Sequence, residues 1–235
     1  MLKVLRKIKR TACWRKLGRE DIKIVHHFVK QIYSKTDPVS QALKISEDEA
    51  SFFADQAVFS LQYQQSLCAF DPESKDIFCV AIISGPHRLR DTKVFDTTRK
   101  LTLKQLQINE AFATLSRGLP KDFENDVYMR GEFVVTEPDY AQLGIASALI
   151  RKSLQLAKKQ EVKRFLSEST SAYSARIREN LGVVCLSQIR YSDYSDPFTK
   201  ERILSSISKP HDAMKLLCHS LHPYVLTKTA TLTKI

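Results

Sequence analysis

The stretch "TEPDYAQLGIASALIRKSL" (residues 136–154) decides the fold, because it leads from an apolar run into a helix through a turn with one glycine. Gly144 stands where that helix should begin. The first turn of a helix leaves backbone N–H groups without partners, and the helix dipole adds partial positive charge there. With no side chain at 144, the amides of residues 142–147 are open to a pyrophosphate. A glycine at such a turn can also be present for steric reasons alone, so this feature by itself does not decide between anion binding and a purely structural turn.

Two other phosphate-binding patterns are absent from the sequence. It contains neither GxxxxGK followed by Ser or Thr, the loop of nucleotide hydrolases, nor GxGxxG, the dinucleotide fingerprint. An anion at the turn would therefore be held mostly by backbone N–H groups.

Helical and strand patterns alternate on both sides of this stretch, and no repeat or linker divides the chain. The pattern predicts one α/β domain with a mixed sheet over residues 12–235, preceded by a basic arm at 1–11. Ser46 followed by Glu49 is a capping box that begins a helix. Strands are expected at 12–17, 66–71, 76–85, 127–137, 162–169, 183–194 and 222–232, and helices at 19–35, 46–65, 102–119, 144–159, 171–182 and near 198–220.

Composition excludes several classes of protein. The 235 residues include five scattered cysteines without a CxxC pair, which favours reduced thiols in an intracellular compartment over a disulfide framework or a metal site. No apolar run is long enough for a transmembrane helix. We therefore expect a cytoplasmic protein without a metal.

The net charge of +11 is partly local, because residues 1–18 carry seven Lys or Arg and no acid. A solvated arm, a mitochondrial presequence and a contact with nucleic acid or an anionic membrane all fit this segment. No nucleic-acid-binding motif accompanies it, so we expect no nucleic-acid partner.

Two motifs carry a resemblance to a known family. "FVVTEPDYAQLGIASALIRKSLQLA" (133–157) resembles the acyl-CoA-binding motif of the GNAT superfamily of N-acetyltransferases, which is roughly Gln or Arg, two residues, Gly, one residue, then Gly or Ala. "STSAYSARIRENLGVVCLSQIRYSDY" (169–194) resembles the next segment of the insect-type arylalkylamine N-acetyltransferases. The stretch 19–45 resembles that family's first helix, which ends in an acidic-Pro-Leu turn. The likeness is clearest over 130–194 and extends over 17–85.

The resemblance implies a fold and a co-substrate. GNAT domains have a sheet of about seven strands whose two central parallel strands splay apart, and acetyl-CoA enters the gap. Strand 131–136 would pair with the pantetheine arm, with a main-chain N–H near Val135 polarising the acetyl carbonyl. The positions expected to bind acetyl-CoA are Val134, Val135, Thr136, Gln142, Leu143, Gly144, Ile145, Ala146 and Ser147.

An amine that attacks a thioester needs a base, and the departing thiolate needs an acid. Asp37 occupies the acidic position of the acidic-Pro-Leu turn and is the first candidate for the base, although it also suits a helix stop before Pro38. Glu132 is the second, and it also suits an ion-paired strand residue. Ser174, Ser171 and Tyr173 are candidates on the thiolate side. Hydroxyls at a helix start ordinarily cap amides, and Tyr173 also suits core packing.

The sequence departs from the family at two positions. Ala141 stands where Arg or Gln is usual, which removes a charge-assisted phosphate contact, and Gln142 stands where Gly is usual. The expected function is acetyl-CoA-dependent acetylation of the primary amine of a small molecule, such as an arylalkylamine. The alternatives are an acyl-CoA-binding protein with weak or no catalysis, and an acetyltransferase that acts on a protein or polyamine. Nothing in the sequence indicates the oligomeric state.

Overall fold

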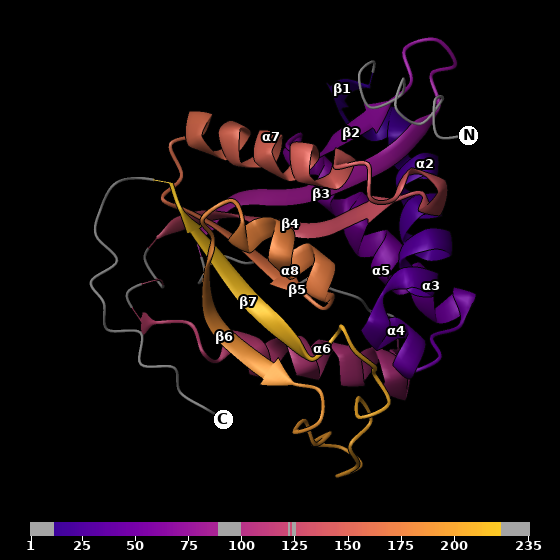
Figure 1. The fold of residues 1–235 in the computed structure, drawn as a ribbon, viewed down its shortest axis with the longest axis vertical. Helices are drawn as coiled ribbons and strands as arrows, with labels where there is room; N and C mark the ends of the chain where they lie inside the picture. The colour runs from indigo at the N-terminus through magenta and orange to yellow at the C-terminus, as the bar shows by residue number, and fades with distance from the viewer. Residues whose placement is uncertain (1–11, 89–99, 122, 124–125, 222–235) are drawn as a thin grey trace.

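The computed structural model describes residues 12–88, 100–121, 123 and 126–221. They form one seven-stranded sheet with helices on both faces (Figure 1). The strands are β1 (Cys13–Lys16), β2 (Leu67–Phe70), β3 (Ile77–Arg88), β4 (Val127–Thr136), β5 (Arg164–Ser169), β6 (Val184–Arg190) and β7 (Ala213–Ser220). The α-helices are α2 (Ile22–His27), α3 (Ser34–Thr36), α4 (Pro38–Ala42), α5 (Glu47–Ser60), α6 (Leu103–Ser116), α7 (Ile145–Lys159) and α8 (Ala172–Glu179). Short helical segments of other types are η1 (Arg19–Asp21), η2 (Phe28–Tyr33), η3 (Leu61–Tyr63) and η6 (Pro138–Tyr140).

The sheet is mixed, as the sequence predicts. Its strand order is β1-β2-β3-β4-β5-β7-β6, and β4 and β5 are its parallel pair. That pairing joins Tyr128–Gly131 to Arg164–Ser167 and stops there. Beyond it, β4 continues against β3 to Thr136, and β5 continues against β7 to Ser169. The two central strands therefore separate after Gly131, which confirms the predicted splay.

A β-bulge lies where the strands separate. Phe133 pairs with Ile82 and Gly131 pairs with Ile83, so Glu132 is an extra residue on β4. A bulge bends its strand and increases the local twist. Because this bend follows directly on the last residue paired with β5, it turns the rest of β4 away from β5.

The core forms a layer on each face of the sheet. Val80 of β3 packs with residues of α2, η2, α5 and α6, whereas its neighbour Cys79 packs with Leu149 of α7. This is the alternation expected of strand side chains. On the α7 face, Ala175 of α8 packs on Leu217 of β7. Figure 1 shows α7 and α8 on the near side of the sheet.

The early helices follow the sequence signals with one difference. α5 begins at the predicted capping box, in which Glu49 N–H donates to Ser46 Oγ at 3.2 Å and Ser46 N–H donates to Glu49. The helix expected at 19–35 is instead a chain of segments, with a 3-10 turn at its start and the π-helix η2 in its middle. Spacing at three and four residues does not distinguish a π-helical turn from an α-helical one. The segment ends before Asp37–Pro38, as predicted.

The helix expected near 198–220 is wrong. Residues 198–212 form turns, and 213–220 form strand β7. β7 lies between β5 and β6 in the sheet, with contacts to α6 and α8, and Leu216 and Leu217 belong to different core clusters. Residues 213–218 are therefore apolar except for Lys215. Such a run does not show the alternation of a half-exposed strand and cannot be told from a helix by periodicity.

The basic arm at 1–11 and the strand expected at 222–232 lie outside the described residues. Within the described part, no helix is long and apolar enough to cross a membrane. No three His, Cys, Asp or Glu side chains gather as metal ligands there either.

The burial of β7 leads to a prediction about the stability of two alanine variants. Leu216 and Leu217 are adjacent, 1% and 0% exposed, and belong to different core clusters. We expect Leu216→Ala and Leu217→Ala each to cost about 2–5 kcal/mol in urea unfolding. Leu103→Ala, at an exposed position of α6, should stay within about 0.5 kcal/mol. A small cost at either 216 or 217 would contradict the strand assignment.

Candidate active site

The edge of β4 beyond Gly131 is open on the side from which β5 departs. Glu137 N–H donates to Phe78 O at 2.9 Å, so this residue's polar groups point toward β3. Backbone groups alternate along a strand, so those of Val135 also point to β3, and those of Val134 and Thr136 point to the open edge. The polarising N–H expected near Val135 is therefore best sought on its two neighbours.

The turn after β4 presents a run of backbone donors. Gln142 and Gly144 both have left-handed backbone conformations, with φ of 62° and 76°. The glycine at position 144 is thus explained first by its backbone conformation, since a positive φ strongly favours glycine over other residues. The first intrahelical bond is Ala148 N–H to Gly144 O at 3.0 Å. The N–H groups of 142–147 have no acceptor among the described residues, and no side chain caps the helix.

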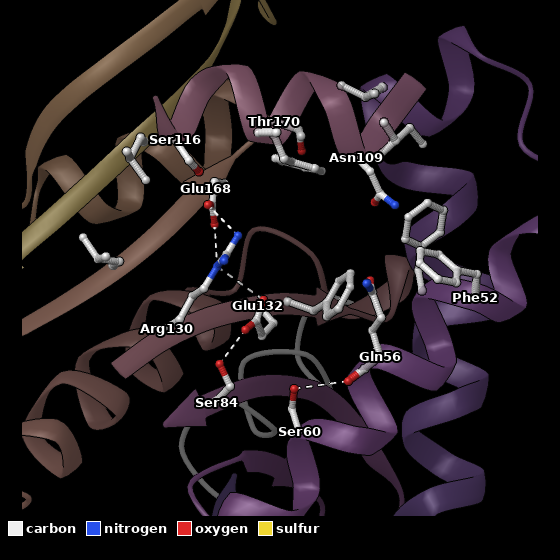
Figure 2. A pocket seen from close by; sticks show the side chains of 18 of the residues that line it. Phe52, Gln56, Ser60, Ser84, Asn109, Ser116, Arg130, Glu132, Glu168 and Thr170 are labelled. Carbon is white, nitrogen blue, oxygen red and sulfur yellow. Dashed lines mark hydrogen bonds and ion pairs between the residues drawn. The ribbon is translucent and has the colours of Figure 1, made fainter. Parts of the chain in front are cut away.

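A cavity of about 670 Å³ opens on the opposite face of the sheet, between the N-terminal helices, α6 and the β4–β5 pair. The helical segments around it contribute most of its aromatic side chains, and β4 and β5 contribute the charged side chains of its floor, Arg130, Glu132 and Glu168 (Figure 2). The aromatic lining residues are Tyr33, Phe52, Phe53, Phe59, Tyr63, Phe112, Tyr128 and Phe133. The acidic lining residues are Asp37, Glu132 and Glu168, and the basic one is Arg130, with His87 at one end. The lining is therefore net acidic when Asp37 is ionised and His87 is neutral.

Asp37 lines this cavity and is 5% exposed. Its carboxylate caps α4 by accepting the Ser40 N–H at 2.8 Å, and it also accepts a bond from the Thr170 hydroxyl. Thr170 in turn is fixed because its carbonyl accepts a bond from the Tyr191 hydroxyl. Burial raises the pKa of Asp37, against the hydrogen bonds from Thr170 and Ser40 that lower it. A carboxylate with a raised pKa accepts a proton more readily than an exposed one.

Arg130 lies between two glutamates on the cavity floor, as Figure 2 shows. Its Nε and one terminal nitrogen donate to the two Glu168 oxygens at 3.0 and 2.6 Å, and its Nε is 3.5 Å from Glu132. The Glu168 side chain is 8% exposed. Burial raises the pKa of Glu168, and the Arg130 charge opposes that effect.

Glu132, the bulge residue, continues this network toward β3. Its Oε1 accepts a 2.5 Å hydrogen bond from Ser84 Oγ, which lies 3.1 Å from His87 Nε2. Burial and then the Arg130 charge lower the pKa of His87, which favours the neutral imidazole. The bulge aims Glu132 into the cavity together with its neighbour Phe133, although adjacent residues on a regular strand face opposite sides.

The start of α8 holds the three hydroxyl candidates, and none of them lines the cavity. Ser171 Oγ caps the helix by accepting the Ser174 N–H at 3.2 Å, and Ser174 Oγ donates to Ser171 O at 3.1 Å. Tyr173 is 60% exposed and packs edge-on against His211. Capping, the ordinary function of hydroxyls at a helix start, thus accounts for Ser171.

The structure brings Asp37 and Glu132 into one cavity and adds residues that sequence reasoning missed. Thr170, which donates to Asp37, sits one residue before the predicted cap Ser171. Alternation along β5 was a usable signal, because Leu166, Glu168 and Thr170 all line the cavity. A charged residue between two buried serines near the end of β5 was a second signal, and it pointed to Glu168.

The sequence matches no model of a known protein family and no curated protein. Solved structures match the fold. Arylalkylamine N-acetyltransferase 2 from Aedes aegypti superposes with a TM-score of 0.76 at 19% identity, over 90% of this chain and 99% of that one. A mosquito arylalkylamine N-acetyltransferase-like 5b gives 0.73 at 20% identity, over 89% and 99%. The Drosophila melanogaster polyamine N-acetyltransferase gives 0.68 at 12% identity, over 89% and 99%. The chain has the GNAT fold. Its GNAT features include the seven-stranded mixed sheet and the separation of the two central strands.

The ion pair on the cavity floor makes a testable prediction. Glu168→Gln leaves Arg130 in the cavity with Glu132 as its remaining anionic partner, so we expect it to cost about 3 kcal/mol in urea unfolding. Glu110→Gln breaks the exposed pair with Arg117, in which the charged nitrogen and oxygen are 2.6 Å apart, and should cost less than about 1 kcal/mol. A cost below about 1 kcal/mol for Glu168→Gln as well would show that the buried ion pair adds no more to stability than an exposed one.

Proposed function

We propose that the protein is an acetyl-CoA-dependent N-acetyltransferase that acts on the primary amine of a small molecule. The observation that carries the proposal is the separation of β4 from β5 after Gly131. It leaves a polar strand edge open between a run of free N–H groups at the α7 turn and a cavity with a buried carboxylate. The structural neighbours that act on arylalkylamines and polyamines support the same reaction class.

Acetyl-CoA fits the donor side on the chemistry of the groups present. The free N–H groups of 142–147, with the positive end of the α7 dipole, suit its pyrophosphate. Val134 and Thr136 offer backbone groups on the open edge of β4 to its pantetheine arm. Ala141 and Gln142 add no charge here, so phosphate binding rests on the backbone. Gln142 is exposed, which leaves its side chain free to turn away from a ligand.

The cavity of about 670 Å³, which we assign to the amine and call the acceptor cavity, fits an amine attached to an apolar or aromatic group. Aromatic side chains form much of its wall, which suits an aryl ring and also stabilises a cation by cation–π contact. The acidic floor attracts an ammonium group, and the overall charge of +11 does not extend into the cavity. We therefore favour an arylalkylamine over a polyamine, which has no apolar ring to bury against this wall.

Asp37 is the group we assign as the base. It faces the cavity, its pKa is raised by burial, and Thr170 and the Ser40 N–H hold its carboxylate in place. It would take the proton of the ammonium, so that the neutral amine can attack the thioester carbon. Glu132 is the second candidate, but Ser84 and Arg130 already engage its oxygens. An open N–H at Val134 or Thr136 would stabilise the negative charge on the carbonyl oxygen.

Acetyl-CoA should stabilise the fold. At 100 times its dissociation constant we expect about 2.7 kcal/mol in thermal or urea unfolding. Ser147→Asp places a negative charge in the first turn of α7, which favours the free helix but repels a pyrophosphate, so binding should weaken at least about tenfold. Ser147→Asn is the neutral control. If millimolar acetyl-CoA shifts nothing in the wild type, the proposed function is wrong.

Asp37→Asn should lower turnover by about 10²–10⁴ in a thiol-release assay with arylalkylamines and leave acetyl-CoA binding unchanged. Asparagine keeps the cap on Ser40 but cannot accept the proton. Because the pKa of Asp37 is raised, wild-type turnover should increase with pH through that pKa, and the variant should lose this limb. Asp48→Asn, at an exposed position of α5, is the control. Unchanged turnover in Asp37→Asn would remove the assignment and direct the search to Glu132.

A further inference from the structure

Arg178 is a buried cation whose charge the folded chain leaves uncompensated. It is 4% exposed, and no carboxylate of the described residues forms an ion pair with it. Its Nε has no hydrogen-bond partner among the described residues, and a terminal nitrogen donates to Ser174 O at 3.1 Å. Glu168 is the acid whose field it feels, but both Glu168 oxygens already accept from Arg130. Burial lowers the pKa of Arg178 to about 10, because removing a cation from water without giving it a partner disfavours its charged form.

Arg178 lies next to the point where β4 and β5 separate. Its side chain projects from α8 into a narrow gap under the sheet, lined by Gly131 and Val134 of β4, Phe165 of β5 and Ser153 of α7. Gly131 is the last β4 residue paired with β5, so Arg178 lies where the two strands begin to separate. The gap has a volume of about 10 Å³, which admits at most one water molecule. The gap itself is therefore too small for an anion, and Gly131 and Phe165 place it beside the opening between β4 and β5.

A second unpartnered polar group lies on the same side of β5. Ser169 Oγ is buried and has no partner among the described residues. Leu166, Glu168 and Thr170 line the acceptor cavity and Phe165 lines the Arg178 gap, so alternation places Ser169 on the Arg178 side. Buried polar groups in native proteins nearly always have partners. Arg178 of α8 and Ser169 of β5 both have a side-chain atom without a partner on this side of the sheet, which indicates a polar ligand there.

We propose that Arg178 binds the thiolate of CoA as it forms, from the helical side of the opening, while the amine enters from the cavity side. This inference rests on the proposed function. The amine nitrogen bonds to the thioester carbon, and the C–S bond breaks with its electron pair on sulfur. The carboxylate base takes the first ammonium proton before the attack and releases it to solvent, and it takes the second proton from nitrogen as the amide forms. Sulfur therefore carries a full negative charge until it takes a proton from solvent as CoA leaves. Arg178 supplies the opposite charge in a place that excludes water, and Ser169 offers its hydroxyl to the adjoining pantetheine arm.

The thiol of bound CoA provides a direct test that does not depend on turnover. A cation within about 4–6 Å lowers the pKa of an acidic group by about 1–3 units. Titrating the protein–CoA complex and following thiolate absorbance in the ultraviolet should therefore give a thiol pKa at least one unit below that of free CoA. Arg178→Met should bring it back to within about half a unit of free CoA, and Arg178→Lys should keep part of the shift. Arg176→Gln, at an exposed position of the same helix, should not change it.

Stability measurements separate this role from a purely structural one. Replacing a buried, uncompensated cation by an apolar side chain of similar size is often neutral or stabilising. Apo Arg178→Met should thus unfold at the same or a higher temperature than the wild type. If Arg178 only anchors Ser174 O, the variant should lose stability and the thiol pKa of wild-type bound CoA should equal that of free CoA.

The two proposals fail differently. Bound CoA with an unshifted thiol pKa in the wild type would overturn the role of Arg178 and leave the acetyltransferase proposal standing. No binding of CoA at all would overturn the proposed function itself.

Discussion

The early end of the parallel pairing between β4 and β5 is the constraint on which the site depends. The backbone polar groups on both edges of a central strand normally form hydrogen bonds with neighbouring strands, but one edge of β4 has no paired strand beyond Gly131. The bulge at Glu132 supplies the bend, and it also turns two consecutive side chains toward the cavity. A single extra residue thus opens the strand edge and places an acid beside it.

Some polar groups around this opening have hydrogen-bond or ion-pair partners and others have none. We use this difference to separate residues with a structural role from those with a functional one. Arg130, Glu168, Glu132 and Ser84 form a closed network in which each charge has a partner. Asp37 is held by two donors but is buried at a cost that raises its pKa. The N–H groups at the α7 turn have no partner, and Arg178 has little more than one carbonyl. Of these groups, the unsatisfied ones lie on the α7 side of the sheet and the satisfied ones on the cavity side.

Local signals allowed the sequence to predict most of the fold. The capping box at Ser46, the stop before Pro38 and the strand–turn–helix around Gly144 rest on neighbours along the chain, and the structure has all three. β7 could not be predicted, because its place in the sheet and the burial of its faces depend on strands and helices far away in sequence. The site followed the same division. Asp37 was predicted from the acidic-Pro-Leu turn and Glu132 from its place on the central strand, and both line the cavity. Thr170, Arg130 and Arg178 could not be predicted, because their environments are formed by residues far away in sequence.

The sheet separates the free N–H groups of the α7 turn from the aromatic cavity, and the opening beyond Gly131 is where the two sides meet. A reaction carried out across such a partition requires both substrates to be bound at once, each on its own side. No described nucleophilic side chain has to carry the acyl group from one side to the other. If the proposed acetyl transfer takes place across this opening, the kinetic order that it implies is sequential, with a ternary complex and direct transfer rather than a double displacement through an acylated enzyme.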